Sequence, residues 1–260
     1  VGSVRCVLER DITREDGTVD EVEGQLNIKH CLAARDKRLS ATIDTCVFYE
    51  GYSWARPVNG ADMASKSGYG VKKFYQPNFT YEEATTDGRN YTCAPLYWLA
   101  EIYLAYAEAK AELGTISDND LNISINKLYE RAGLPKQTVA GLSAMNDPAN
   151  NMGVSSLLWE IRRCRRCELM FDKGQRYWDL VRWHNLDILD NTKYPNVTLG
   201  ANVKNSKSDH TVKTSGVYMD FYKGAQRVFT DREYLFPLGV DQLNLNPELT
   251  QNPGWERPSK

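Results

Sequence analysis

The sequence lacks the features that mark membrane-spanning and nucleic-acid-binding proteins. No window approaches the roughly 18 to 20 consecutive apolar residues that a transmembrane helix needs. The formal net charge of the 260 residues is −2, which gives no basic footprint for nucleic acid or an anionic membrane. Residues 1–9 have no long apolar core of a signal peptide and resemble the middle of an element, so any export signal would have to be encoded upstream. Whether the chain is a fragment of a longer protein stays open.

Histidine is scarce, and the common catalytic motifs are absent. The only three histidines are His30, His184 and His210. There is no His-Glu-x-x-His helix, no glycine-rich phosphate loop and no Gly-x-Ser-x-Gly elbow. We therefore predict a protein that is not an enzyme and has no catalytic residues, no metal and no cofactor.

Six cysteines are present, at positions 6, 31, 46, 93, 164 and 167. A chain of this size does not need disulfides to fold, so we expect mostly free or partly paired thiols. Cys164 and Cys167 have the Cys-x-x-Cys spacing of redox pairs and zinc half-sites. No second pair completes four ligands, and the two lie inside an expected helix rather than at its N-terminus. This favours a structural role.

The clearest helical pattern runs from residue 96 to residue 113. Apolar residues recur on two stripes at helical spacing, which predicts a helix packed on both sides. Gly114 is a natural stop, and Ser117 is a natural N-cap with acids following it. A second stripe then continues to Ala132, where Gly133 ends it. Two helices with a short connection form the unit of tetratricopeptide-like stacking.

Further helices are predicted over residues 154–171 and 176–184, so that the helical core spans about residues 95–185 of a single region, 1–260. Residues 41–49 favour a β-strand and residues 71–75 a short one. The segments 30–94, 136–153 and 186–260 are predicted to be rich in loops, with extended chain after residue 232.

Segment 161–183 is dense in arginine, acids and aromatic rings. One hypothesis is a basic nucleic-acid surface. Against it, acids fall three or four residues from arginines, as in intrahelical ion pairs. Arginine and aromatic side chains can also lock helices together by stacking and bidentate pairing. We favour an architectural role for this segment.

A long polar loop near residues 49–56 offers the best ligand candidates. Flat aromatic faces beside polar side chains are typical of carbohydrate sites. The predicted ligand-binding residues are Tyr49, Tyr52, Trp54, Arg56 and Tyr75. The alternative is a loop held in place by its own aromatic rings.

Five blocks together resemble a known family. Ile161–Trp183 is similar to the SusD/RagB pattern of an arginine-rich helix followed by Arg-Tyr-Trp-Asp-Leu-x-Arg-Trp. The alanine–glutamate helix of residues 98–114 and the helix stop of residues 126–135 also resemble that family. So do Arg35–Leu39, which resembles a strand entry, and the C-terminal signature within residues 234–254. The chain departs from the family pattern at Cys164, where Glu is usual, and at Cys167, where an apolar residue is usual, so its arginines must be neutralised differently.

The resemblance implies a mainly α, SusD-like fold of tetratricopeptide-like helix pairs with long loops and a few short strands. It implies the C-terminal portion of a lipoprotein about twice this length, held on the extracellular face of an outer membrane by an N-terminal lipid anchor that this chain lacks. The implied partners are an oligosaccharide and a SusC-like TonB-dependent transporter. Two alternatives stay open: a protein- or peptide-binding helical module without a sugar site, and a thiol oxidoreductase at Cys164 and Cys167.

Overall fold

A computed structural model describes residues 36–44, 70–71, 73–74, 76, 78–80, 82–83, 86–93, 95–202, 214–215, 218–220 and 224–256. The α-helices are α3 (Lys37–Thr42), α6 (Leu99–Glu112), α7 (Asp118–Ile123), α8 (Ile125–Ala132), α9 (Val139–Ala144), α10 (Ser156–Glu168), α11 (Gln175–Arg182) and α12 (Val240–Leu245). Three 3-10 helices are η1 (Leu186–Leu189), η2 (Pro195–Thr198) and η3 (Asp231–Tyr234). The predicted mainly helical fold is confirmed over these residues.

The described strands are short. They are β1 (Ile43–Asp44), β2 (Gly70–Val71), β3 (Leu199–Asn202), β4 (Thr214–Ser215) and β5 (Tyr218–Asp220). β1 and β2 form an antiparallel pair, and the second sheet has the order β3-β5-β4. No helix in the described part of the chain is both long and apolar enough to cross a membrane.

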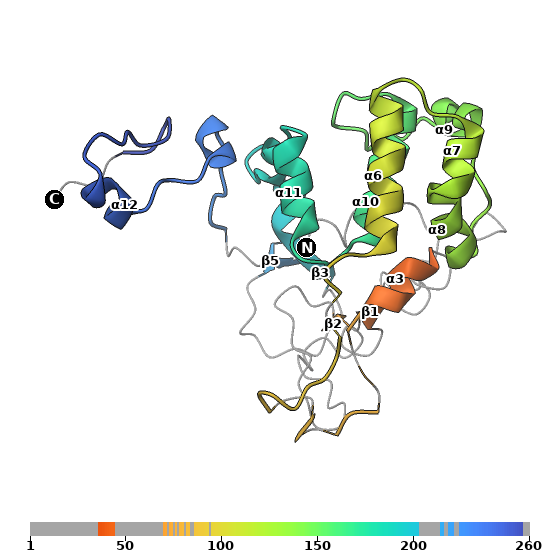
Figure 1. Ribbon diagram of the computed structural model, residues 1–260, viewed down its shortest axis with the longest axis horizontal. Helices are drawn as coiled ribbons and strands as arrows, with labels where there is room; N and C mark the ends of the chain where they lie inside the picture. Colours follow the sequence, from red (N-terminus) through yellow and green to blue (C-terminus); the bar gives the residue numbers. More distant parts are fainter. Residues whose placement is uncertain are drawn as a thin grey trace.

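The core lies where α6, α8 and α10 meet (Figure 1). Leu104 and Ala107 of α6, Ile125 of α8 and Ile161 of α10 are buried together in one cluster. Cys164 belongs to the same cluster, so it packs as a small apolar side chain. This cluster fixes the positions of the helices that carry the charged residues described below.

The local signals at the helix ends act as predicted. Ser117 caps α7 by accepting a hydrogen bond from the Asp120 N–H, and the Asp120 carboxylate accepts one from the Ser117 N–H in return. Gly133 ends α8 with φ of +72°, and the Leu134 N–H reaches back to the Tyr129 carbonyl over 2.8 Å. The predicted helix pair is therefore present, although its second helix is interrupted at Ser124 into α7 and α8.

The prediction that the first helix of this pair is packed on both sides is wrong for the described residues. α10, α7 and α8 all contact one side of α6, which buries Leu104, Ala107 and Glu108. The opposite side carries Leu99, which is 64% exposed, and Ile102, which is 56% exposed. On this side the Tyr106 hydroxyl donates to Asp120 of α7, and Leu99 lines a cavity together with residues of α3.

The predicted strand entry at residues 35–39 is also wrong from Asp36 on. Asp36 instead caps α3, and its carboxylate accepts from the Arg38 N–H over 2.9 Å. Thr42 keeps the last turn helical because its hydroxyl donates to the Arg38 carbonyl over 2.8 Å. Buried contacts of Arg38 and Leu39 hold this helix against α10 and override the β-propensity of the run. Of the residues 41–49 predicted to form a strand, 41–44 are described, and among these Ile43 and Asp44 form a strand.

The strand predicted over residues 71–75 ends at Val71, and Lys73 and Phe74 lie in a turn. Short elements also form where loop or extended chain was predicted. α9 lies within residues 136–153, and α12 lies in the C-terminal tail. Each buries a single leucine, Leu142 and Leu243, so neither has a stripe that periodicity could reveal.

Asp190 connects the segment after η1 to the C-terminal tail through hydrogen bonds. Its carboxylate accepts from the Thr192 hydroxyl over 2.6 Å and from the Phe229 N–H over 3.1 Å. Hydrogen bonds, above all that from the Thr192 hydroxyl, lower the pKa of Asp190 to about 2. The folded protein therefore prefers the ionised carboxylate.

We expect this preference to appear in the acid dependence of stability. An Asp in the unfolded chain titrates near pH ~3.9, so the stabilisation by Asp190 is fully present above that pH and is lost as the pH falls towards 2. The variant Asp190→Asn should lose part of its stability at pH 7 and show a flatter decline between pH 5 and pH 2. Urea unfolding at several pH values measures both, and parallel declines in the two proteins would contradict the assignment.

Candidate functional site

The arginines of α10 connect it to its neighbours. Arg162 donates to Glu108 of α6 over 3.3 Å, and Arg165 makes two bonds, of 2.9 and 2.8 Å, to Asp179 of α11. Both arginines and both acids are buried. The architectural role predicted for segment 161–183 therefore fits the geometry.

The sequence predicted that the acids of segment 161–183 form ion pairs with arginines of the same helix. The structure shows such pairs for some of these residues but not for Glu168. Arg163 with Glu160 and Arg182 with Asp179 are pairs within one helix. Glu168, in contrast, pairs with Arg38 and Arg131 from other elements. The Glu168 side chain is buried against neighbouring helices, so its partners come from α3 and α8 and not from the next turn of α10.

Trp183 shows how aromatic rings enter this network. The guanidinium carbons of Arg162 and Arg182 lie 4.5 and 4.7 Å from the centre of its ring. Its indole N–H donates to Glu108. One tryptophan thus links α6, α10 and the end of α11, as the Arg–aromatic pattern predicts.

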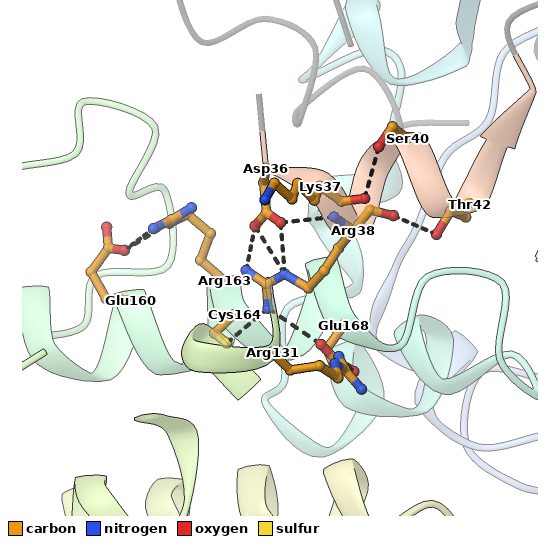
Figure 2. Close-up of polar contacts among 10 residues, drawn as sticks. All are labelled: Asp36, Lys37, Arg38, Ser40, Thr42, Arg131, Glu160, Arg163, Cys164 and Glu168. Carbon is orange, nitrogen blue, oxygen red and sulfur yellow. Dashed lines mark hydrogen bonds and ion pairs between the residues drawn. The ribbon is translucent and has the colours of Figure 1, made fainter. Parts of the chain in front are cut away.

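Arg38 lies beside Cys164, and two acidic side chains balance its positive charge (Figure 2). Its Nε donates to both oxygens of Asp36, over 3.0 and 2.9 Å, and its Nη1 reaches Glu168 over 3.4 Å. Burial acts to raise the pKa of Asp36, but the hydrogen bonds and charge of Arg38 outweigh it and lower that pKa. Asp36 and Glu168 therefore neutralise Arg38 at the place where family members usually carry a Glu.

The Cys164 thiol is part of this cluster, and its surroundings favour the unreactive protonated form. Arg38 Nη1 lies 3.3 Å from Cys164 Sγ. Burial raises the pKa of Cys164 despite the charge of Arg38, so the thiol stays protonated at neutral pH. Cys164 and Cys167 are buried and not bonded to each other, whereas Cys93 is exposed and free.

We expect the three described thiols to differ sharply in alkylation. Iodoacetamide should label Cys93 in the native protein, while Cys164 and Cys167 should react only after unfolding, because thiolate character and access control the rate. Mass spectrometry of time points in buffer and in urea measures this. Rapid native labelling of Cys164 would revive the thiol oxidoreductase hypothesis.

A cavity of about 470 Å³ lies beside this cluster, between α3, the start of α6 and the C-terminal ends of α8 and α10. Its volume falls within the roughly 300–1,000 Å³ that is usual for small-molecule pockets. Among its lining residues are Lys37, Lys73, Trp98, Arg131, Glu168 and Asp172. An aromatic ring among charged side chains can hold a polar ligand such as a sugar.

Most of the charged groups around the cavity already have partners. Lys73 donates to the Glu168 and Met170 carbonyls over 3.2 and 3.0 Å and to Asp172 over 2.7 Å. It thereby caps the end of α10, where carbonyl groups lack helical partners. Lys37 is exposed, and its Nζ lies against Gly133. Lys37 and the half-buried Trp98 are the lining groups best placed to meet a ligand.

Sequence reasoning did not point to this cavity. The sequence pattern predicted a helix from residue 96 on, whereas Trp98 precedes α6 as its N-cap residue and lines the cavity. The ligand residues that the sequence predicts all lie outside the described residues. They are Tyr49, Tyr52, Trp54, Arg56 and Tyr75.

A model of the SusD family matches residues 27–255. The chain belongs to the SusD family. Two solved structures have the same fold. The first is a protein named BT4246, with 22% identity and a TM-score of 0.59, and the match covers 96% of this chain and 43% of that one. The second is a SusD-like protein, BF3747, from Bacteroides fragilis NCTC 9343, with 25% identity, a TM-score of 0.58, and coverage of 97% and 46%. No curated protein matches the chain.

The SusD-family assignment confirms the resemblance drawn from the five sequence blocks. This chain spans less than half the length of the solved structures it matches, 43% and 46% respectively. The SusD-family match covers residues 27–255, and the activity of the whole protein is a matter of proposal.

Proposed function

We propose that this chain takes part in capturing oligosaccharide nutrients at the extracellular face of an outer membrane, for delivery to a SusC-like TonB-dependent transporter. The SusD-family match over residues 27–255 is the observation that carries the proposal. An N-terminal lipid anchor of the full-length protein would hold it at the membrane. Binding is noncovalent, through aromatic stacking and hydrogen bonds, and the buried, protonated Cys164 thiol is consistent with a protein that does no covalent chemistry.

The loop around Trp54 is our proposed sugar-contacting segment. Tyr49, Tyr52 and Trp54 supply rings, and Arg56 supplies hydrogen-bond donors. Tyr75 is the fifth proposed contact. The cavity beside Trp98 is the second candidate site, because an aromatic ring and charged side chains line it.

Two variants distinguish these places. A glycan array on the full-length protein first identifies an oligosaccharide, and titration calorimetry then compares Trp54→Ala with Trp98→Ala. We expect Trp54→Ala to weaken binding about tenfold or more, as truncation of an aromatic anchor does, with an unchanged melting temperature. Loss of affinity only in Trp98→Ala would move the sugar site to the cavity.

The same measurements test the function itself. Silence on the glycan array, combined with copurification of the transporter, would contradict sugar capture and favour the protein- or peptide-binding module. Full affinity in both variants would mean that neither ring contacts the sugar.

A further inference from the structure

The cavity between α3, the start of α6 and the C-terminal ends of α8 and α10 has a surplus of positive charge. Its described lining includes more basic than acidic side chains. The basic ones are Lys37, Arg38, Lys73 and Arg131, and the acidic ones are Glu168 and Asp172. A wall of unequal charge attracts a ligand of the opposite sign, because a cleft with low-dielectric walls focuses the field. The pairing within the wall decides where the surplus lies.

Three of the basic side chains are paired with the acids of the wall. Lys73 Nζ lies 2.7 Å from Asp172 Oδ2. The Glu168 carboxylate lies between Arg38 and Arg131, and each of its two oxygens pairs with one of them (Figure 2). Both acids are therefore already committed to these three basic groups, and neither is left to balance a further positive charge.

Lys37 is the basic side chain of this wall without an acidic partner. It is exposed, and it forms no ion pair with any acid in the described part of the chain. Its Nζ lies 3.0 Å from the position that a Cβ at residue 133 would occupy, so Gly133 leaves the space for the ammonium group at the end of α8. The carbonyl groups at a helix C-terminus attract a cation. The surplus positive charge therefore lies at a defined point of the cavity wall.

Trp98 adds a flat apolar surface to the same cavity. It is half-buried, and among the described residues it has no ring stacked on it and no acceptor for its indole N–H. A half-buried tryptophan usually finds an acceptor for that N–H. The cavity thus combines a free aromatic face, a free N–H donor and a free ammonium group.

We propose that this cavity is a subsite for an acidic sugar residue, a pyranose that carries a carboxylate. The sugar ring stacks on Trp98 and its carboxylate pairs with Lys37. Arg131, whose side chain is 57% exposed, has N–H groups beyond the one that binds Glu168, and these can donate to sugar hydroxyls. The inference rests on the proposed capture of oligosaccharides, since it names the class of sugar, and it adds a second contact point to the loop around Trp54.

Sugars that differ by one carboxylate test the role of charge. Saturation-transfer NMR and titrations of the full-length protein compare galacturonic acid with galactose, and glucuronic acid with glucose. We expect at least one acid to bind about tenfold more tightly than its neutral parent. Added salt should reduce this difference, because the contact is electrostatic. Acids that bind no better than their neutral parents would overturn the inference.

Variants at the cavity show where the acid binds. Lys37→Met should weaken binding of the acid about tenfold and leave both the neutral sugar and the melting temperature unaffected, because Lys37 is exposed. Lys37→Arg keeps the charge and should retain most of the affinity, whereas Trp98→Leu, which removes the ring, should lose it. Lys127→Met is the matched control, since Lys127 is exposed on α8 and does not line the cavity.

The outcomes separate this inference from the proposed function. Equal affinity for the acid in Lys37→Met and Lys127→Met would place the acid elsewhere and overturn the subsite. A glycan array that identifies a neutral oligosaccharide, with no binding of either acid, would overturn the subsite and leave glycan capture standing. Silence of the array towards all glycans would remove both.

Discussion

Glu108→Ala is expected to destabilise the protein by about 3–5 kcal/mol, the usual cost of breaking a buried ion pair. Glu108 is 3% exposed and accepts hydrogen bonds from Arg162, Arg182 and Trp183. Removing its carboxylate leaves the buried Arg162 with the half-exposed Glu112 as its acidic partner, and it removes the hydrogen bonds of α6 with Arg182 and Trp183. Glu108 and Trp183 together join α6, α10 and the end of α11 at one point.

Glu112 provides the matched control for that variant. It lies one turn further along α6 and pairs with the same arginine, since Arg162 Nη2 is 3.0 Å from Glu112 Oε1. Its side chain is 47% exposed, so Glu112→Ala should cost no more than about 1 kcal/mol. Urea unfolding of both variants gives the comparison. Equal losses would show that Glu108 acts only as a surface charge.

The ends of the helices were predictable because their signals are local. Gly114, Ser117 and Gly133 act on neighbouring residues only, and the structure has each in its expected role. The break at Ser124 was not predictable in the same way. Ser124 is buried, with φ of −127° and ψ of −101°, and the apolar stripe of residues 121–132 continues through it without a change of period.

The partners of the charged residues could not be predicted from spacing. Glu108 and Arg182 are separated by 74 positions, and Arg38 and Glu168 by 130. A one-dimensional pattern favours pairs one turn apart, because it contains no information on which helices pack together. The pattern of arginines, acids and aromatic rings predicted an architectural role for residues 161–183 but not which residues pair within the segment.

The same limit applies to the cavity beside Trp98. The cavity is assembled from α3, α6, α8 and α10, so it exists only after those helices pack. Apolar residues on more than one side of α6 were visible in the sequence, but the structure packs one side and leaves Leu99 and Ile102 mostly exposed.

The buried pair of Arg165 and Asp179 should show strong coupling when both partners are replaced. Both side chains are nearly inaccessible, 6% and 4% exposed, and two hydrogen bonds join them. Arg165→Met or Asp179→Leu alone should cost about 3–5 kcal/mol, because each leaves an uncompensated buried charge. The double variant should cost less than either single one, since well-packed apolar residues can replace a buried pair at little loss.

The surroundings of this pair support the expectation that the double variant loses less stability than either single variant. Gln175 accepts from Arg165 over 3.3 Å but also donates to Glu101 over 2.9 Å, so it keeps a partner in the double variant. Arg182 loses Asp179 but is 43% exposed and retains Glu108. The exposed pair Arg89 and Glu82, treated in the same way, should show single costs and coupling below about 1 kcal/mol. If the costs at Arg165 and Asp179 simply add, the two residues act separately and α10 and α11 are held together by other contacts.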